Sequence, residues 1–560
     1  MSGDPGKFVQ FWQELKRRKV IHVIIVYASA AFVIIELVNN VYESLQLPEW
    51  TPTLVILLLV IGFPIAVIFS WIYDITSKGI VRTESADQKK DKPDAAPDNS
   101  IVVLPFQNLS PESEQEYFCD GITEEIINAL THVKSLKVIA RTSAFAFKGK
   151  FKDIRKIGRE LNVGTVLEGS VRKTGNKLRI TAQMINVSDG IHLWSETYDC
   201  EMKNIFEIQD EISLAIVDKL KVELFDEEKE RIQKIPTKNL EAYNHYLKGQ
   251  HYVYNDRNWD GLQKAMKCFQ QAIDSDPGFA LAVTGLANSY IALLDWGYLH
   301  PMEATSRIRE LLSRSLALED FHAETYMAHV YPQAFYDLDY KAAERSIAKA
   351  LQLQQNSPFV HHFYALFQMT EGKFESAIEH NRRARELDPL SAIFNFAYGL
   401  ILYMAGQFER SLDQYQKTLL LEKSFVLIHL WGLFPNLQLE RIDEAVGSYT
   451  KYLLSNPVTE KFAPLPGKAF ESGGKEGFLQ WIIEEGLSHD KGVYNHPYWK
   501  AIFYANMGKT EEAIDQLGRV MELRSPRMVY IRVEPAFTKM QSHPRFLEII
   551  KEIGSLTEPG

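Results

Sequence analysis

A 34-residue repeat in the second half of the chain constrains the fold more than any other feature of the sequence. Small residues recur at this interval at Ala343, Ala377, Ser411 and Ala445. The positions four and seven residues after each of them share one face of a helix, because a helix has 3.6 residues per turn. Gly372 and Gly406, also 34 residues apart, fall where a turn between two helices is expected. The period predicts a stack of helix pairs over residues 238–535, with a capping segment at 536–560.

This pattern resembles the tetratricopeptide repeat family. The resemblance implies an all-α superhelix in which the first helix of each pair lines a concave groove that binds partner proteins. The matching positions in this chain are His362, Met369, Phe396, Tyr403, Leu430 and Leu437. Packing against a neighbouring helix is the alternative interpretation for each of these residues. His361 and His362 suggest no metal site, because no third ligand stands at a suitable spacing.

An α+β domain with a mixed sheet is predicted over residues 100–230. Residues 101–106 form a buried-type strand, and apolar residues after Asp120 recur with helical spacing. Residues 163–171, 177–187 and 191–198 alternate with period two around two Gly-containing turns, which is typical of antiparallel hairpins. Residues 206–224 form a closing amphipathic helix.

Several blocks of this domain, including Val103-Leu104-Pro105-Phe106 and Asp120-Gly121-Ile122-Thr123, resemble the domain shared by the N-terminal part of TolB and by FlgO. The resemblance implies no enzymatic activity. Asp120, Thr123 and Arg141 are candidate ligand-binding residues, because a helix start after a strand can hold an anion. Their alternative roles are structural: Asp120 or Thr123 as a helix cap and Arg141 as the ion-pair partner of a nearby acid. No glycine-rich phosphate loop and no nucleophile motif is present, so no catalytic residue is predicted.

Two apolar runs near the N-terminus, residues 20–38 and 54–73, predict a transmembrane helical hairpin spanning residues 20–74. Lys and Arg are abundant in residues 1–19 and after residue 74 but absent from 39–53, which predicts both ends on the cytoplasmic side. Residues 1–19 are predicted to form a basic amphipathic helix on the bilayer surface, and residues 75–99 a flexible linker. The expected location is the inner, cytoplasmic membrane of a bacterium, with multiple passes and the folded domains facing the cytoplasm.

The composition of the chain limits which classes of function it can have. The formal net charge of −10 argues against nucleic acid as a partner, since phosphate binding needs clustered Lys and Arg. Three separated cysteines give neither a disulfide framework nor a metal site, and no cofactor is predicted. The sequence predicts a multidomain, non-enzymatic adaptor or signalling scaffold whose partners are other proteins and the lipid bilayer. Its alternatives are a small-ligand sensor built on the α+β domain and an auxiliary subunit of a nucleotide cyclase-type signalling system.

Overall fold

The structure is a computed structural model that describes residues 20–41, 48, 50–76, 79–82, 99–110, 116–150, 153–233, 236–255, 259–295, 299, 301–319, 322–455, 458–489 and 496–557. The chain divides into two compact units, Met1–Asp94 and Ala95–Gly560. The helix predicted over residues 1–19 lies outside the described residues.

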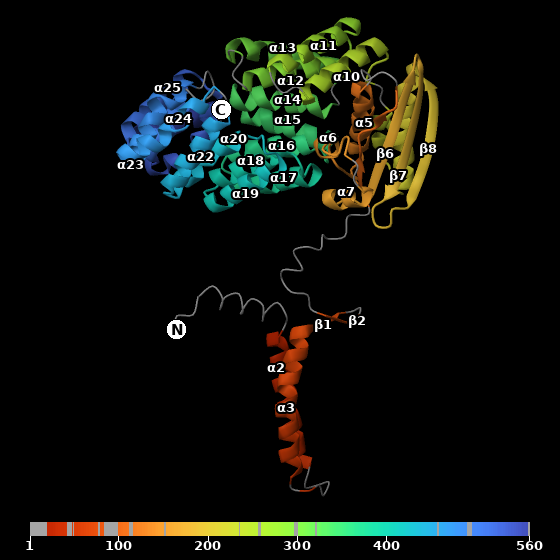
Figure 1. The fold of residues 1–560 in the computed structure, drawn as a ribbon, viewed down its shortest axis with the longest axis vertical. Helices are drawn as coiled ribbons and strands as arrows, with labels where there is room; N and C mark the ends of the chain where they lie inside the picture. Colours follow the sequence, from red (N-terminus) through yellow and green to blue (C-terminus); the bar gives the residue numbers. More distant parts are fainter. Residues whose placement is uncertain are drawn as a thin grey trace. The chain divides into compact units, whose positions relative to one another are not determined.

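The first unit contains a helix pair followed by two short strands (Figure 1). Helix α2 (Val20–Val41) packs against α3 (Thr51–Ile72), and the Tyr27 hydroxyl donates to the Leu59 carbonyl oxygen at 2.7 Å. Strands β1 (Tyr73–Thr76) and β2 (Gly79–Arg82) pair antiparallel. The predicted linker of residues 75–99 therefore begins within a strand pair, and residues 83–98 lie outside the described part.

The predicted membrane hairpin at residues 20–38 and 54–73 is wrong. Crossing the hydrocarbon core of a bilayer takes about 20 consecutive, predominantly apolar residues in one helix. Within the described residues, no helix is both long enough and apolar enough to do so. The predicted multi-pass location in the bacterial inner membrane depended on this hairpin, and it is overturned for the same reason.

The second unit begins with a mixed sheet of strand order β5-β3-β6-β7-β8. Strand β3 (Ser100–Val103) runs parallel to β5 (Lys137–Val138) and to β6 (Thr165–Thr174), and β4 (Gln107–Asn108) also pairs parallel with β6. Strands β7 (Lys177–Asn186) and β8 (His192–Glu201) continue the sheet antiparallel. Gly175 and Gly190 adopt positive φ in the two connecting turns, where a side chain would be strained. The predicted mixed-sheet domain is confirmed.

Helices cover one face of this sheet because buried and more exposed side chains alternate along its strands. On β7, Leu178, Ile180, Ala182 and Met184 are buried, and the residues between them are not. Helices α5 (Glu116–Thr131) and α8 (Ile205–Lys219) supply the apolar side chains that meet this face. The smaller helices are α6 (Arg141–Phe145), α7 (Ile154–Leu161), η2 (Met202–Asn204) and α9 (Asp226–Ile232).

The rest of the unit is a stack of antiparallel helix pairs, which confirms the predicted repeat (Figure 1). Ala343, Ala377, Ser411 and Ala445 are fully buried at the contact inside their pairs. Gly372 and Gly406 form the turns with positive φ. The helices are α10 (Leu240–Asn255), α11 (Trp259–Ser275), α12 (Ala280–Asp295), α13 (Pro301–Leu318), α14 (Ala323–Phe335), α15 (Tyr340–Leu353), α16 (Pro358–Thr370), α17 (Phe374–Leu387), α18 (Ala392–Met404), α19 (Phe408–Leu421), α20 (Leu427–Trp431), α21 (Leu433–Gln438), α22 (Ile442–Leu454), α24 (Pro497–Asn506) and α25 (Thr510–Glu522).

The C-terminal part departs from the regular repeat. Helix α23 (Leu465–Glu484) is kinked at Gly474, and the short helices η3 (Glu460–Phe462) and η4 (Gly486–His489) flank it. The chain ends in η5 (Pro526–Tyr530), η6 (Pro535–Met540) and α26 (Pro544–Thr557).

One hydrophobic core is shared by the α+β domain and the first helices of the array. It runs from Ile101 in β3 through α5 and α8 to Ala328 in α14. The rings of Phe206 and Tyr243 meet across the predicted boundary with centroids 4.6 Å apart. A second core, from Ala323 to Ile553, fills the remaining repeats.

Candidate functional site

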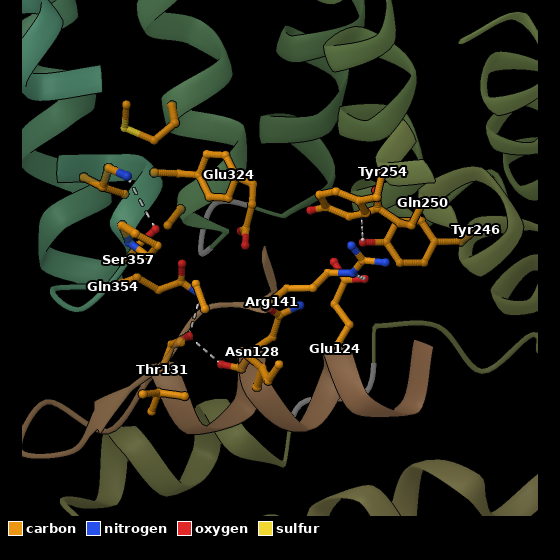
Figure 2. Close-up of a pocket in the computed structure, with 18 residues that line it drawn as sticks. Glu124, Asn128, Thr131, Arg141, Tyr246, Gln250, Tyr254, Glu324, Gln354 and Ser357 are labelled. Atoms are coloured by element: carbon orange, nitrogen blue, oxygen red, sulfur yellow. Dashed lines mark hydrogen bonds and ion pairs between the residues drawn. The ribbon is translucent and has the colours of Figure 1, made fainter. Parts of the chain in front are cut away.

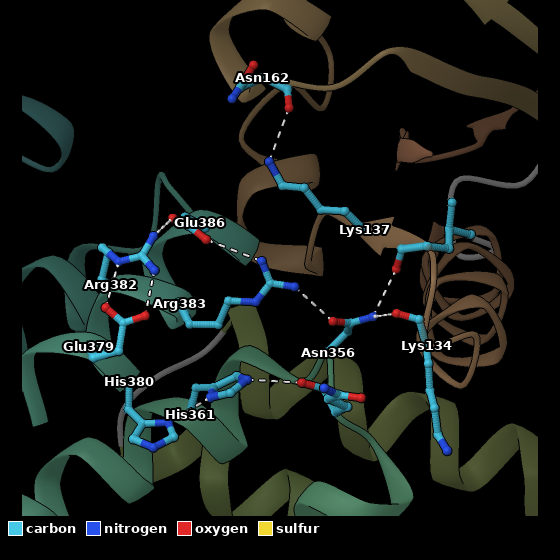
Figure 3. Close-up of polar contacts among 12 residues, drawn as sticks. Lys134, Lys137, Asn162, Asn356, His361, Glu379, His380, Arg382, Arg383 and Glu386 are labelled. Atoms are coloured by element: carbon cyan, nitrogen blue, oxygen red, sulfur yellow. Dashed lines mark hydrogen bonds and ion pairs between the residues drawn. The ribbon is translucent and has the colours of Figure 1, made fainter. Parts of the chain in front are cut away.

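A buried asparagine side chain joins the array to the α+β domain through hydrogen bonds to backbone carbonyl oxygens (Figure 3). Asn356, 3% exposed in the loop before α16, donates from Nδ2 to the carbonyl oxygens of Val133 (3.4 Å), Lys134 (3.0 Å) and Leu136 (3.0 Å). Its Oδ1 accepts from Arg383 Nη2 at 3.0 Å. The carbonyl groups of Lys134 and Leu136, which lie beyond the end of α5, gain a hydrogen-bond partner in this way.

A second junction lies at the start of α6. The Asp388 carboxylate accepts hydrogen bonds from the Ser143 backbone N–H at 2.9 Å and from the Ser143 hydroxyl. The Ala140 N–H donates to the Leu387 carbonyl oxygen at 2.9 Å. Ser143 and Asp388 are fully buried, so both domains fix the position of Arg141, the first residue of α6.

Between these junctions lies a cavity of about 140 Å³ (Figure 2). The α+β domain lines it with Glu124, Asn128, Thr131 and Arg141. The array lines it with Tyr246, Gln250, Tyr254, Glu324, Gln354 and Ser357, as Figure 2 shows, and with Phe359. We call it the joint cavity, because neither domain encloses it alone.

Arg141 is held rigidly in the joint cavity. Its Nε lies 3.2 Å from Glu124 Oε2, and its guanidinium carbon lies 4.1 Å from the ring centroids of both Phe145 and Tyr254. A guanidinium between two aromatic faces gains cation–π attraction while its carboxylate partner neutralises it. Burial raises the pKa of Glu124, and the charge of Arg141 opposes that rise.

A smaller cavity of about 100 Å³ adjoins the first and shares Asn128, Tyr246, Glu324 and Gln354 with it. Glu125 lines this second cavity and forms no hydrogen bond or ion pair within the described residues. Burial, followed by the charges of Glu124 and Glu324, raises the pKa of Glu125 to about 8. The two cavities together are lined by four carboxyl groups and two guanidinium groups, so carboxyl groups outnumber cations: Glu124, Glu125, Asp210 and Glu324 against Arg141 and Arg231.

Of the three predicted ligand-binding residues, Arg141 alone lines the joint cavity. Asp120 pairs with Lys148 Nζ at 2.5 Å and lies 3.6 Å from His251 Nδ1. The Thr123 hydroxyl donates to the Cys119 carbonyl at 2.9 Å and accepts from the Phe106 N–H at 3.0 Å. Neither residue caps the helix, because α5 begins earlier, at Glu116.

The predicted partner-binding residues lie inside the array. His362, Met369, Tyr403, Leu430 and Leu437 are buried, and Phe396 is half-buried against the ring of Tyr415. The segment between η5 and η6 covers part of this surface, since Tyr403 and Tyr498 both donate from their hydroxyls to the buried carboxylate of Glu534. Most of these positions therefore pack the core of the array, whereas Leu437 also lines an open groove.

An open groove lies instead at the edge of the array where the first helix of each pair turns into the second. Its volume is about 780 Å³, and its lining includes the turns at Gly372, Gly406 and Gly508 together with residues 532–536. Two sequence signals point to this groove: the spacing of the turn glycines, and Leu437, which was predicted to bind partners. We call it the turn-edge groove.

The described residues contain no group of three or more His, Cys, Asp or Glu side chains arranged to hold a metal ion. The polar side chains of the joint cavity comprise the Arg141–Glu124 ion pair beside two rings, the amides of Asn128, Gln250 and Gln354, and the carboxyl group of Glu324. Fold and site together define a tetratricopeptide-type repeat protein with a docked α+β domain.

Comparisons with known proteins support parts of this description. The family described as the HilA/YgeH-like transcriptional regulator, second domain, matches residues 97–215, which is the α+β domain. The "Putative adenylate cyclase 3" of Rhizobium meliloti (strain 1021) is 45% identical over 197 residues, which cover 35% of this chain and 33% of the relative. The chain thus spans about a third of that relative's length.

Solved repeat proteins are similar at low identity. YrrB, "a TPR protein with an unusual peptide-binding site", is 17% identical with a TM-score of 0.26 and covers 36% of this chain and 98% of its own. PilW, a "type IV pilus biogenesis factor", is 15% identical with a TM-score of 0.33 and covers 40% and 97%. Both TM-scores are below 0.5, so the repeat assignment rests on the helix pairs of this chain itself.

Proposed function

We propose that this chain is a non-enzymatic scaffold that binds other proteins through its repeat array. The observation that carries the proposal is the turn-edge groove, which is about 780 Å³ in volume and lined by successive repeats. Stacked repeats present extended surfaces that suit a polypeptide better than a compact substrate.

Site-specific photo-crosslinking of the full chain tests the proposal. A photoreactive residue replaces Gln541, which is exposed at the groove, and in a control replaces Ser195, which is exposed on β8. We expect one partner protein to be crosslinked from position 541 and not from position 195, and the purified partner to bind the purified chain. Equal capture from both positions, or turnover of ATP by the purified chain, would contradict a non-enzymatic scaffold that acts through the array.

Sensing of a small ligand is the second candidate function, and the unpaired Glu125 beside the joint cavity favours it. A ligand held by residues of both domains stabilises the folded unit by mass action, by about 2.7 kcal/mol at a hundredfold excess over Kd. The excess of carboxyl groups suits a small aliphatic amine.

Thermal unfolding of the full chain with putrescine, with cadaverine, or with sodium chloride at equal ionic strength tests the sensor function. We expect a diamine to raise Tm by several degrees, more at pH 9 than at pH 7, because Glu125 loses its proton around pH 8. Glu125→Gln should abolish the pH dependence of the shift. Equal shifts with the diamines and with salt would exclude this ligand class.

A further inference from the structure

The turn-edge groove combines an accessible backbone with an adaptable apolar lining. A methyl group added at Gly406 or Gly508 would meet nothing within 4 Å, so the groove is open above both turns. Phe374, Met404, Phe408 and Met507 supply apolar lining from three repeats. Methionine is flexible and polarisable, and it accommodates differently shaped apolar side chains.

Polar groups suited to a peptide backbone lie beside this lining. Gln438 Nε2 donates to Asn506 Oδ1 at 3.0 Å, so two side-chain amides from different repeats stand together in the groove. Side-chain amides offer both donors and acceptors, which is what an extended main chain requires.

Some charged side chains in the groove have hydrogen-bond or ion-pair partners, and others do not. Lys475 Nζ lies 2.9 Å from both carboxylate oxygens of Glu440, and the Glu534 carboxylate is satisfied by two tyrosine hydroxyls and by the Ala536 N–H. Arg532 and Lys539 line the groove, are exposed, and form no hydrogen bond or ion pair within the described residues. Among the described residues, these two cations therefore have no ion-pair partner in the groove, although the chain as a whole has a net charge of −10.

We propose that the turn-edge groove binds an extended acidic peptide segment of a partner protein, with its carboxylates at Arg532 and Lys539 and an apolar side chain against Met404 and Met507. This inference rests on the proposed scaffold function and gives the partner a chemistry. Charge complementarity selects this occupant: a neutral or basic segment would leave both cations unpaired, and a small anion would leave the apolar lining uncovered.

Selection from a random library of phage-displayed 12-residue peptides on the immobilised full chain tests the inference. We expect the enriched peptides to be acidic and to contain Met, Leu or Phe. We expect their Kd, measured with synthetic copies, to rise at least tenfold for the variant R532E/K539E and to rise with added salt. The control K423E/K468E makes the same change in net charge at exposed lysines outside the groove and should leave Kd unchanged.

The outcomes separate this inference from the function on which it rests. Peptides that are not acidic, or that bind R532E/K539E as tightly as the parent, overturn the acidic-peptide assignment while leaving the scaffold function standing. The failure of any peptide to bind the array overturns both. If the control K423E/K468E raises Kd as much as R532E/K539E does, the effect comes from long-range charge, and the assignment of the binding site to the groove is overturned. Enrichment of peptides whose sequences match segments of this chain would identify a second copy of the chain as the occupant and overturn the partner assignment.

Discussion

Replacing Asn356 with leucine is expected to lower the free energy of unfolding by about 3 kcal/mol. The side chains have similar volume, but leucine cannot donate to the carbonyl oxygens of Lys134 and Leu136, each now 3.0 Å from Asn356 Nδ2. A buried acceptor without a partner costs about 1–3 kcal/mol, and the charged hydrogen bond from Arg383 is lost as well. Urea unfolding of the full chain measures the loss, and hydrogen exchange should locate it in residues 130–138.

Asn381→Leu provides a matched control for this prediction. Asn381 is fully buried in α17, and neither its Nδ2 nor its Oδ1 has a hydrogen-bond partner within the described residues. Replacing it with leucine removes two unsatisfied polar atoms, so we expect stability to be unchanged or to increase by about 1 kcal/mol. If both variants lose the same free energy, side-chain shape rather than hydrogen bonding holds the two domains together.

Glu534→Gln is expected to stabilise the chain at pH 8 by about 3 kcal/mol. Burial raises the pKa of Glu534 from 4.5 to about 7, against the opposing effect of its bonds to Tyr403, Ala536 and Tyr498. In the folded parent the carboxyl group therefore keeps its proton over a range where the unfolded chain has lost it. The free energy of unfolding of the parent therefore falls as the pH rises from about 4.5 to about 7, by about 1.4 kcal/mol per pH unit. Above pH 7 this contribution no longer changes.

Glutamine keeps the carbonyl acceptor and cannot ionise, so the variant should lack this fall. Urea unfolding at pH 5 and at pH 8 measures the difference: near zero at pH 5 and about 3 kcal/mol at pH 8. Glu522→Gln, at an exposed position in α25, serves as the control and should show no pH-dependent gain. A difference between parent and Glu534→Gln that is the same at both pH values would show that Glu534 is ionised throughout.

The repeats and the order of strands and helices in the α+β domain could be predicted from the sequence because local patterns determine them. Small residues 34 apart end up fully buried at Ala343, Ala377, Ser411 and Ala445, and turn glycines take the positive φ that favours glycine. The antiparallel β7 and β8 follow from alternation and tight turns. These signals act within one or two elements.

The sites could not be predicted because distant residues build them. Asn356 meets carbonyl groups more than 200 positions earlier, and its own neighbours indicate only a helix start. Glu534 covers Tyr403 from a segment without repeat spacing, so the burial of this predicted groove residue could not be foreseen. Arg141 was found through its place after a strand, but its second stacking partner, Tyr254, belongs to the array. Two apolar runs and the Lys and Arg residues that flank them predict a membrane hairpin that the described helices do not support.

The continuous core from Ile101 to Ala328 also bears on how such chains are shuffled in evolution. A recombination event or a cloning boundary near residue 235 would separate Tyr243 and its neighbours in α10 from Phe206. Both products would then expose apolar surface that is buried in the intact chain. The segment that can move intact between genes therefore includes the first helix pairs. Asn356 and Asp388 also join the sheet domain to the array, so its transfer should carry along α10 to α17. The repeats after α17 should be the part that varies in number.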